Sequence, residues 1–166
     1  MKRYEYVGPE EVRLAAQAEA SGVVIRSADD LAAWVREHEA DGDAYGVGAT
    51  FVIGVDGYLR IASRRSEHVA CAGGQSVLAA GEMFFSTDRP PVVVVVSNLS
   101  TGYCPEPACW GAVQVALDLA GIEHPGELTD AFVFRRCSAC RERNLVKDEY
   151  FVCAICEAEL PADWNF

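Results

Sequence analysis

Residues 137–156 read CSACRERNLVKDEYFVCAIC and contain two pairs of cysteines with the same internal spacing. Cys137 and Cys140 form the first pair, and Cys153 and Cys156 form the second, with twelve residues between the pairs. Two such pairs can bring four thiolates to one tetrahedral zinc ion. Thiolates also bind iron, so zinc is predicted only as the more common structural metal. Because protein ligands would fill all four positions, we expect a structural zinc without an open site for substrate.

The twelve residues between the cysteine pairs are enough for a short turn and a strand, and in this the segment resembles rubredoxin-like ribbons. The resemblance implies a zinc ribbon at residues 132–166, following a main domain at residues 1–131. Aromatic residues in and beside the ribbon indicate that it packs against the main domain; they are Phe132, Phe134, Tyr150, Phe151 and Trp164.

Upstream of the cysteines, the sequence predicts two hairpins. In TFVIGVDGYLRIA, residues 50–62, Asp56-Gly57 separates two runs rich in β-branched and aromatic residues. Residues 76–85 and 91–97 form the second pair of expected strands. Val92 to Val96 show no alternation of polar and apolar residues, so we expect a central strand that is covered on both faces.

Three helices are expected around these strands. One begins after Pro9 and ends at Ser21-Gly22, a second is capped by Ser27, and a third opens at Pro105 and ends before Gly121. The order of elements predicts an α+β fold: a mainly antiparallel sheet with flanking helices and a C-terminal zinc ribbon.

Charge and composition narrow the possible partners. The formal charge of −11 argues against general binding of nucleic acid, because phosphate contacts need clustered cations. Residues 135–147 are a local exception, with five basic side chains and one acidic side chain. These cations either offset the negative charge of a four-thiolate zinc centre or recognise an acidic partner or a nucleotide.

The expected location is the cytoplasm, without membrane association. The sequence has no apolar run of about 18 residues, and its N-terminal residues lack the apolar stretch of a signal peptide. Seven cysteines is an odd number, and four of them have metal spacing, which favours a reducing compartment over disulfides. Cys71, Cys104 and Cys109 are then free thiols.

Two polar segments, residues 66–82 and 97–107, fall at expected strand ends and glycine-rich turns, where binding and catalytic groups are frequent. The candidate catalytic residues are His68 as acid or base, Glu82, and Tyr103 as a donor to developing charge. The candidate ligand-binding residues are Gly74, Asn98, Ser100 and Cys71. Structural alternatives stay open: His68 as a hydrogen-bonded core histidine, and Asn98, Ser100 and Tyr103 as caps of the loop and the following helix.

Residues 66–107 also contain a pattern that includes His68, Gly74 and Gly81-Glu82, followed by Ser97-Asn98 and Tyr103. It resembles a signature of uncharacterised domains in bacterial effector-like and toxin-like proteins. Their second motif reads SGHY, whereas this chain has Ser100-Thr101-Gly102-Tyr103 and therefore lacks the second histidine.

Three functions follow from these features as alternatives. The first is a binding, adaptor or regulatory module with a protein partner and a polar pocket around His68, Glu82, Asn98 and Tyr103, which can also take a small molecule or nucleotide. The second is an enzyme, a group transferase or hydrolase, that uses this pocket. The third is an immunity-type inhibitor of a basic toxin, with which the acidic charge is compatible.

Overall fold

The computed structural model describes residues 1–166 and is built around a five-stranded sheet. Every pair of neighbouring strands is antiparallel, and the spatial order is β1-β3-β2-β4-β5. The strands are β1 (Val23–Ile25), β2 (Val47–Gly54), β3 (Leu59–Ser63), β4 (Val77–Phe85) and β5 (Val93–Val96). The predicted α+β class with a mainly antiparallel sheet is confirmed.

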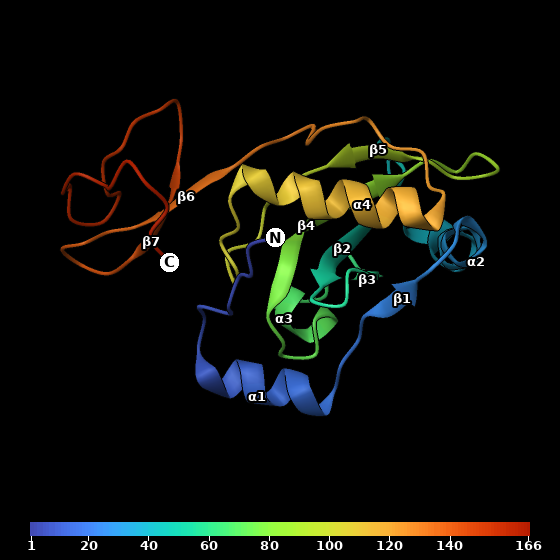
Figure 1. Cartoon of the computed structure of the whole chain (residues 1–166), viewed down its shortest axis with the longest axis horizontal. Coiled ribbons are helices and arrows are strands. Elements are labelled where there is room, and N and C mark those ends of the chain that lie inside the picture. The colour runs from blue at the N-terminus through green and yellow to red at the C-terminus, as the bar shows by residue number, and fades with distance from the viewer.

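Four α-helices flank the sheet, and α4 runs across its front in Figure 1. They are α1 (Glu10–Ala18), α2 (Ala28–His38), α3 (His68–Cys71) and α4 (Trp110–Ala120), with short 3₁₀ turns at Glu39–Asp41 and Pro107–Cys109. The predicted cap of α2 is confirmed, because the Ser27 hydroxyl accepts a hydrogen bond from the Asp30 N–H at 3.2 Å. Gly121 ends α4 with a φ of +69°, which glycine adopts without strain. The helix after Pro9 ends earlier than predicted, and the single turn α3 was not predicted.

The two faces of the sheet differ in what covers them. Residues that pair across antiparallel strands point to the same side, so Val47 and Phe85 share one face, while Thr50 and Glu82 share the other. On the first face, Phe85 packs edge-on against Trp34 of α2, with ring centroids 6.2 Å apart. On the second face, α3 covers one end through Cys71, whose thiol lies 3.5 Å from the Arg60 carbonyl oxygen. The other end of this face carries Glu82.

Strand β5 corrects the expectation of a central valine strand. It lies at the edge of the sheet, and its Val94 side chain is 39% exposed. The outer edge of β5 is covered by the segment after α4: the Val93 N–H donates to the Glu123 carbonyl, and the Thr129 N–H donates to the Val96 carbonyl, both at 2.9 Å. This irregular segment satisfies the backbone groups that an edge strand leaves open, so a run of valines does not require two neighbouring strands.

The cysteine-containing segment forms a small unit beside the main sheet (Figure 1). Its two antiparallel strands are β6 (Val133–Arg136) and β7 (Arg143–Val146). Trp164 fixes it to the rest of the chain: its indole N–H donates to the Cys104 carbonyl at 2.8 Å, and its ring meets Tyr4 edge-on at 5.6 Å. The division into domains at residues 1–131 and 132–166 stays a prediction. None of the helices combines the length and apolar character needed to cross a membrane.

Candidate metal centre and polar pocket

The four cysteines of the ribbon converge on one point. Their Sγ atoms all lie within 4.8 Å of one another, and the pairs Cys137–Cys156 and Cys140–Cys153 are each separated by 3.6 Å. A tetrahedral ion with metal–sulfur bonds of about 2.3 Å requires sulfur–sulfur distances of about 3.8 Å. The cluster can therefore hold a metal ion with four thiolate ligands.

The two cysteine pairs have the same backbone geometry. The Arg141 N–H donates to the Cys137 carbonyl and the Glu157 N–H donates to the Cys153 carbonyl, both at 3.0 Å. Arg141 and Glu157 follow the second cysteine of their pairs and have φ values of +69° and +62°. These tight turns aim backbone N–H groups at the sulfur atoms. The N–H of Cys140 is the main cause that lowers the pKa of the Cys137 thiol, and the N–H of Cys156 is the main cause that lowers the pKa of Cys153 to about 6. The turns thus favour the thiolate form of the first cysteine of each pair.

Asn144 supports this centre and was not predicted. Its side chain is buried between the cysteine pairs, where its amide donates toward the Cys153 sulfur at 3.5 Å and its carbonyl oxygen accepts from the Ala154 N–H at 3.0 Å. Such contacts orient metal ligands. A single asparagine between two cysteine pairs carries no sequence signal that would distinguish it from a surface residue.

Most of the basic residues of the ribbon contact the chain itself. Arg135 donates to the carbonyls of Phe134, Pro161 and Ala162, and Arg143 donates to the Thr101 carbonyl. The Arg136 guanidinium lies 5.1 Å from the centroid of the Phe166 ring. None of these arginines forms an ion pair with a carboxylate. These three arginines therefore serve in large part to hold the ribbon and the C-terminal segment in place.

His68 is the first residue of α3, and its Nε2 atom lies 2.9 Å from the Gly81 carbonyl oxygen. A carbonyl oxygen only accepts hydrogen bonds, so Nε2 carries the proton. Burial is the main cause that lowers the pKa of His68. The imidazole is therefore held in its neutral form, with Nδ1 as the unprotonated nitrogen.

Tyr103, Asn98 and Ser100 are buried, and the first two contact backbone groups. The Tyr103 hydroxyl, in a fully buried side chain, donates to the Gln75 carbonyl at 2.7 Å. The Asn98 amide donates to the carbonyls of Pro105 and Phe132 at 2.9 and 2.8 Å, and its oxygen accepts from the Phe132 N–H at 2.7 Å. Ser100 is also buried, and its hydroxyl has no hydrogen-bond partner. Gly74 has a φ of +72° and is approached by α1, since a Cβ there would lie 2.8 Å from the Arg13 carbonyl oxygen.

The three cysteines outside the ribbon are also buried. Burial is the main cause that raises the thiol pKa to about 12 in Cys71, Cys104 and Cys109. The position of Cys109 directly before α4 does not outweigh this effect. A thiol with such a pKa is a poor nucleophile near neutral pH, because the thiolate is the reactive form.

Glu82 differs from the other candidates because it reaches a large cavity. It is partly exposed, forms no ion pair, and lies with Phe84 and Ser97 in the lining of a cavity of about 390 Å³ on the open end of the sheet face. None of the other six candidates lines this cavity. The structure thus separates Glu82 from Tyr103 and Asn98, whose polar groups contact the backbone.

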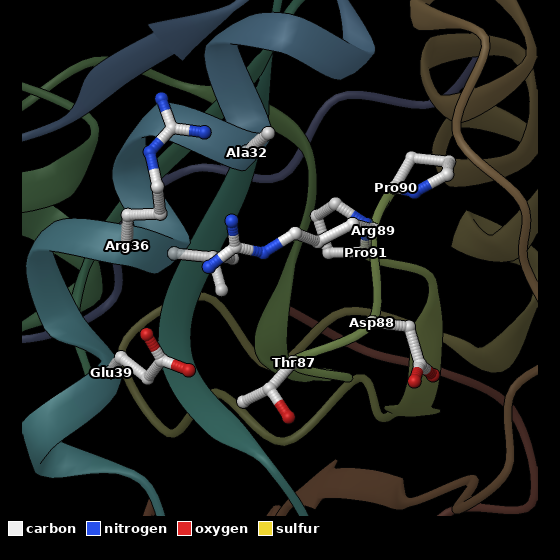
Figure 2. A pocket seen from close by; sticks show the side chains of 9 residues that line it. Ala32, Arg36, Glu39, Thr87, Asp88, Arg89, Pro90 and Pro91 are labelled. Atoms are coloured by element: carbon white, nitrogen blue, oxygen red, sulfur yellow. The ribbon is translucent and has the colours of Figure 1, made fainter.

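A smaller cavity of about 90 Å³ lies between α2 and the loop that follows β4 (Figure 2). In Figure 2 the side chain of Arg89 extends from the loop toward α2, whose Arg36 lines the cavity together with Glu39 of the 3₁₀ turn that follows α2. Asp88 is the second acidic residue of the lining, so the formal charges of the lining cancel. Small volume and balanced charge make this cavity a weaker candidate than the one beside Glu82.

Comparison with protein-family models, with curated proteins and with solved structures finds no match to this chain. The expected likeness of residues 66–107 to toxin-associated domains has no support from these comparisons.

Proposed function

We propose that the chain is a small zinc-containing binding module in which zinc fixes the ribbon and a protein partner binds elsewhere on the surface. Four cysteine ligands and no carboxylate or histidine in the cluster favour a closed, structural site. Zinc is preferred to iron because a reduced, structural four-cysteine site most often contains zinc.

The observation that carries the proposal is that candidate catalytic groups are already bonded to the protein backbone. Tyr103 donates its only hydroxyl hydrogen to Gln75, and His68 donates its Nε2 hydrogen to Gly81. A general acid must offer its proton to the substrate, and these protons point to carbonyl oxygens of the chain. The buried cysteines offer no activated nucleophile either.

Metal analysis combined with partner capture tests the proposal. The purified chain should contain one equivalent of zinc, and a tagged wild-type chain and its Tyr103→Phe variant should capture the same partner from host lysate. Tyr103→Phe removes only a buried hydroxyl, so a binding surface should survive it. A protein with iron in place of zinc would contradict the choice of metal.

The enzymatic alternative rests on His68 Nδ1, which is unprotonated, and on the unpaired carboxylate of Glu82. If the wild-type protein catalyses a reaction and a correctly folded His68→Gln variant does not, the result would favour the enzymatic alternative and contradict the binding module.

A further inference from the structure

The cavity beside Glu82, which we call the sheet-face cavity, combines aromatic walls with carboxylates. Phe84, Tyr45 and Phe132 contribute aromatic rings, and Tyr45 meets Phe84 edge-on at 6.0 Å. Glu82, Asp130 and Asp43 contribute three carboxylates, against one cationic side chain, that of Arg64. A cation is attracted both by aromatic faces and by carboxylates, so the lining suits a positively charged group.

The chain itself already places one guanidinium in this environment. The Arg64 guanidinium lies 4.7 Å from the centroid of the Phe84 ring and 3.6 Å from an oxygen of Asp43. Gly48 makes this packing possible, since a Cβ there would lie 2.9 Å from Arg64 Cδ and 3.0 Å from Phe84. Arg64 satisfies Asp43, whereas Glu82 and Asp130 have no cationic partner.

The arrangement does not suit a metal ion. The ribbon cysteines are the one group of His, Cys, Asp or Glu whose ligand atoms converge closely enough to hold a metal. The three carboxylates of the sheet-face cavity do not form such a group. Carboxylates that do not converge on one point, beside aromatic rings, fit a planar, delocalised cation with several donors, which describes arginine better than the compact ammonium of lysine.

The sheet-face cavity also adjoins another hollow of the surface. A second cavity of about 440 Å³ shares Asp43, Arg64 and Phe84 with it. Two adjoining cavities can accommodate residues that flank one anchoring side chain. The overall charge of −11 would accelerate association with a basic partner.

We infer that the sheet-face cavity binds an arginine side chain of a basic protein segment, with Glu82 and Asp130 as its carboxylate partners. This inference rests on the proposed function as a binding module and names the chemistry of its partner. Arg64 then competes with the arginine of the partner, because its guanidinium lies over the face of one aromatic ring and its positive charge repels a second cation.

Titration of ¹⁵N-labelled protein with N-acetyl-arginine amide tests the inference directly. We expect saturable shifts of the Phe84, Ser97 and Leu99 amides at millimolar ligand, and no such shifts with N-acetyl-citrulline amide, which has the same shape without the charge. Equal shifts with citrulline or with N-acetyl-lysine amide would overturn the assignment to arginine, and so would an absence of shifts with arginine.

Two pairs of variants locate the site. Glu82→Gln should weaken the binding of arginine about fivefold. Glu19→Gln is the same change at the exposed residue that follows α1, and it should leave binding unchanged. Arg64→Ala should strengthen binding about fivefold, whereas Arg65→Ala, the same charge change outside the sheet-face cavity, should have little effect. Each variant's own amide spectrum verifies its fold.

If Glu82→Gln and Glu19→Gln bind arginine equally well, the inference is wrong. A partner that is captured equally by wild type and Glu82→Gln would contradict this inference and leave the binding module intact. A catalytic activity that wild type has and His68→Gln lacks would instead contradict the proposed function as a binding module.

Discussion

Asn98 and Phe132 are joined by two reciprocal hydrogen bonds: the Phe132 N–H donates to Asn98 Oδ1 at 2.7 Å, and Asn98 Nδ2 donates to the Phe132 carbonyl at 2.8 Å. The same Nδ2 also donates to the Pro105 carbonyl at 2.9 Å. One fully buried side chain thus connects the loop after β5, the segment before α4 and the first residue of the ribbon segment.

Asn98→Ala should strongly destabilise the protein, because three backbone groups lose their partner in a buried place. We expect a loss of about 3 kcal/mol in the free energy of unfolding, since each unsatisfied buried group costs about 1–3 kcal/mol. Chemical denaturation measures it.

Asn165 offers a matched control, because it forms the same reciprocal pair with the N–H and carbonyl of Arg136, each at 2.8 Å, but is solvent-exposed. Water can replace its bonds, so Asn165→Ala should cost less than about 1 kcal/mol. Equal losses in the two variants would mean that burial does not set the cost.

Local patterns predicted those parts of the fold that neighbouring residues determine. The Asp56-Gly57 turn, the Ser27 cap and the cysteine pairs each depend on a few residues close in sequence, and each is present. The position of β5 depends on the irregular segment that covers its edge, and no periodicity in the valines reveals that segment.

The candidate site was harder to predict, because it too depends on residues that are distant in sequence. Asparagine and tyrosine near glycine-rich turns are compatible with ligand binding and with bonds to the backbone, and only the distant partners of Asn98 and Tyr103 distinguish the two. For Glu82, the cavity is formed by β4, β5 and the loops around Asp43 and Asp130, which are far apart in sequence.

Removal of the metal should unfold the ribbon. Cys140→Ser leaves three thiolates, and we expect it to lose the bound zinc and much of the folding free energy of residues 137–160. Metal analysis and the amide spectrum of the ribbon measure both effects. Cys109→Ala is the control, because it removes a buried thiol outside the cluster and should retain one equivalent of zinc. A Cys140→Ser protein with a native ribbon and full zinc content would contradict the assignment of this ligand.

Gly81 should not tolerate a side chain. A Cβ at this position would lie 1.9 Å from the Ser97 carbonyl oxygen and 3.0 Å from Asn98 Cα, both of which are backbone atoms. Gly81→Ala must therefore separate β4 from the loop after β5, and we expect a loss of more than about 3 kcal/mol in the free energy of unfolding.

The contrasting glycine is Gly111 in α4, where a Cβ meets nothing within 4 Å. Gly111→Ala should stabilise the protein by about 0.5–1 kcal/mol, because alanine favours the helix. The two alanine variants should thus shift the melting temperature in opposite directions, and shifts of the same sign would contradict the close contact at Gly81.

The neutral state of His68 predicts a specific dependence of stability on pH. Burial lowers the pKa of His68 below its ordinary value of 6.5 in the folded protein. Below pH 6.5 the unfolded chain therefore binds a proton at this residue that the folded chain does not yet bind. The contribution of His68 to stability is complete above pH 6.5 and is lost as the pH falls through the folded pKa, with a slope of at most about 1.4 kcal/mol per pH unit.

His68→Gln isolates this effect, since a glutamine amide can still donate to the Gly81 carbonyl but does not titrate. Denaturation of both proteins between pH 7 and pH 5 should show that wild type loses more stability than His68→Gln as the pH falls. Protonation of the ribbon thiolates and of the other two histidines affects both proteins equally, so the difference between the curves belongs to His68. Parallel curves would mean that His68 binds its proton as readily in the folded chain as in the unfolded one, and the imidazole would then be open to solvent rather than held neutral against Gly81.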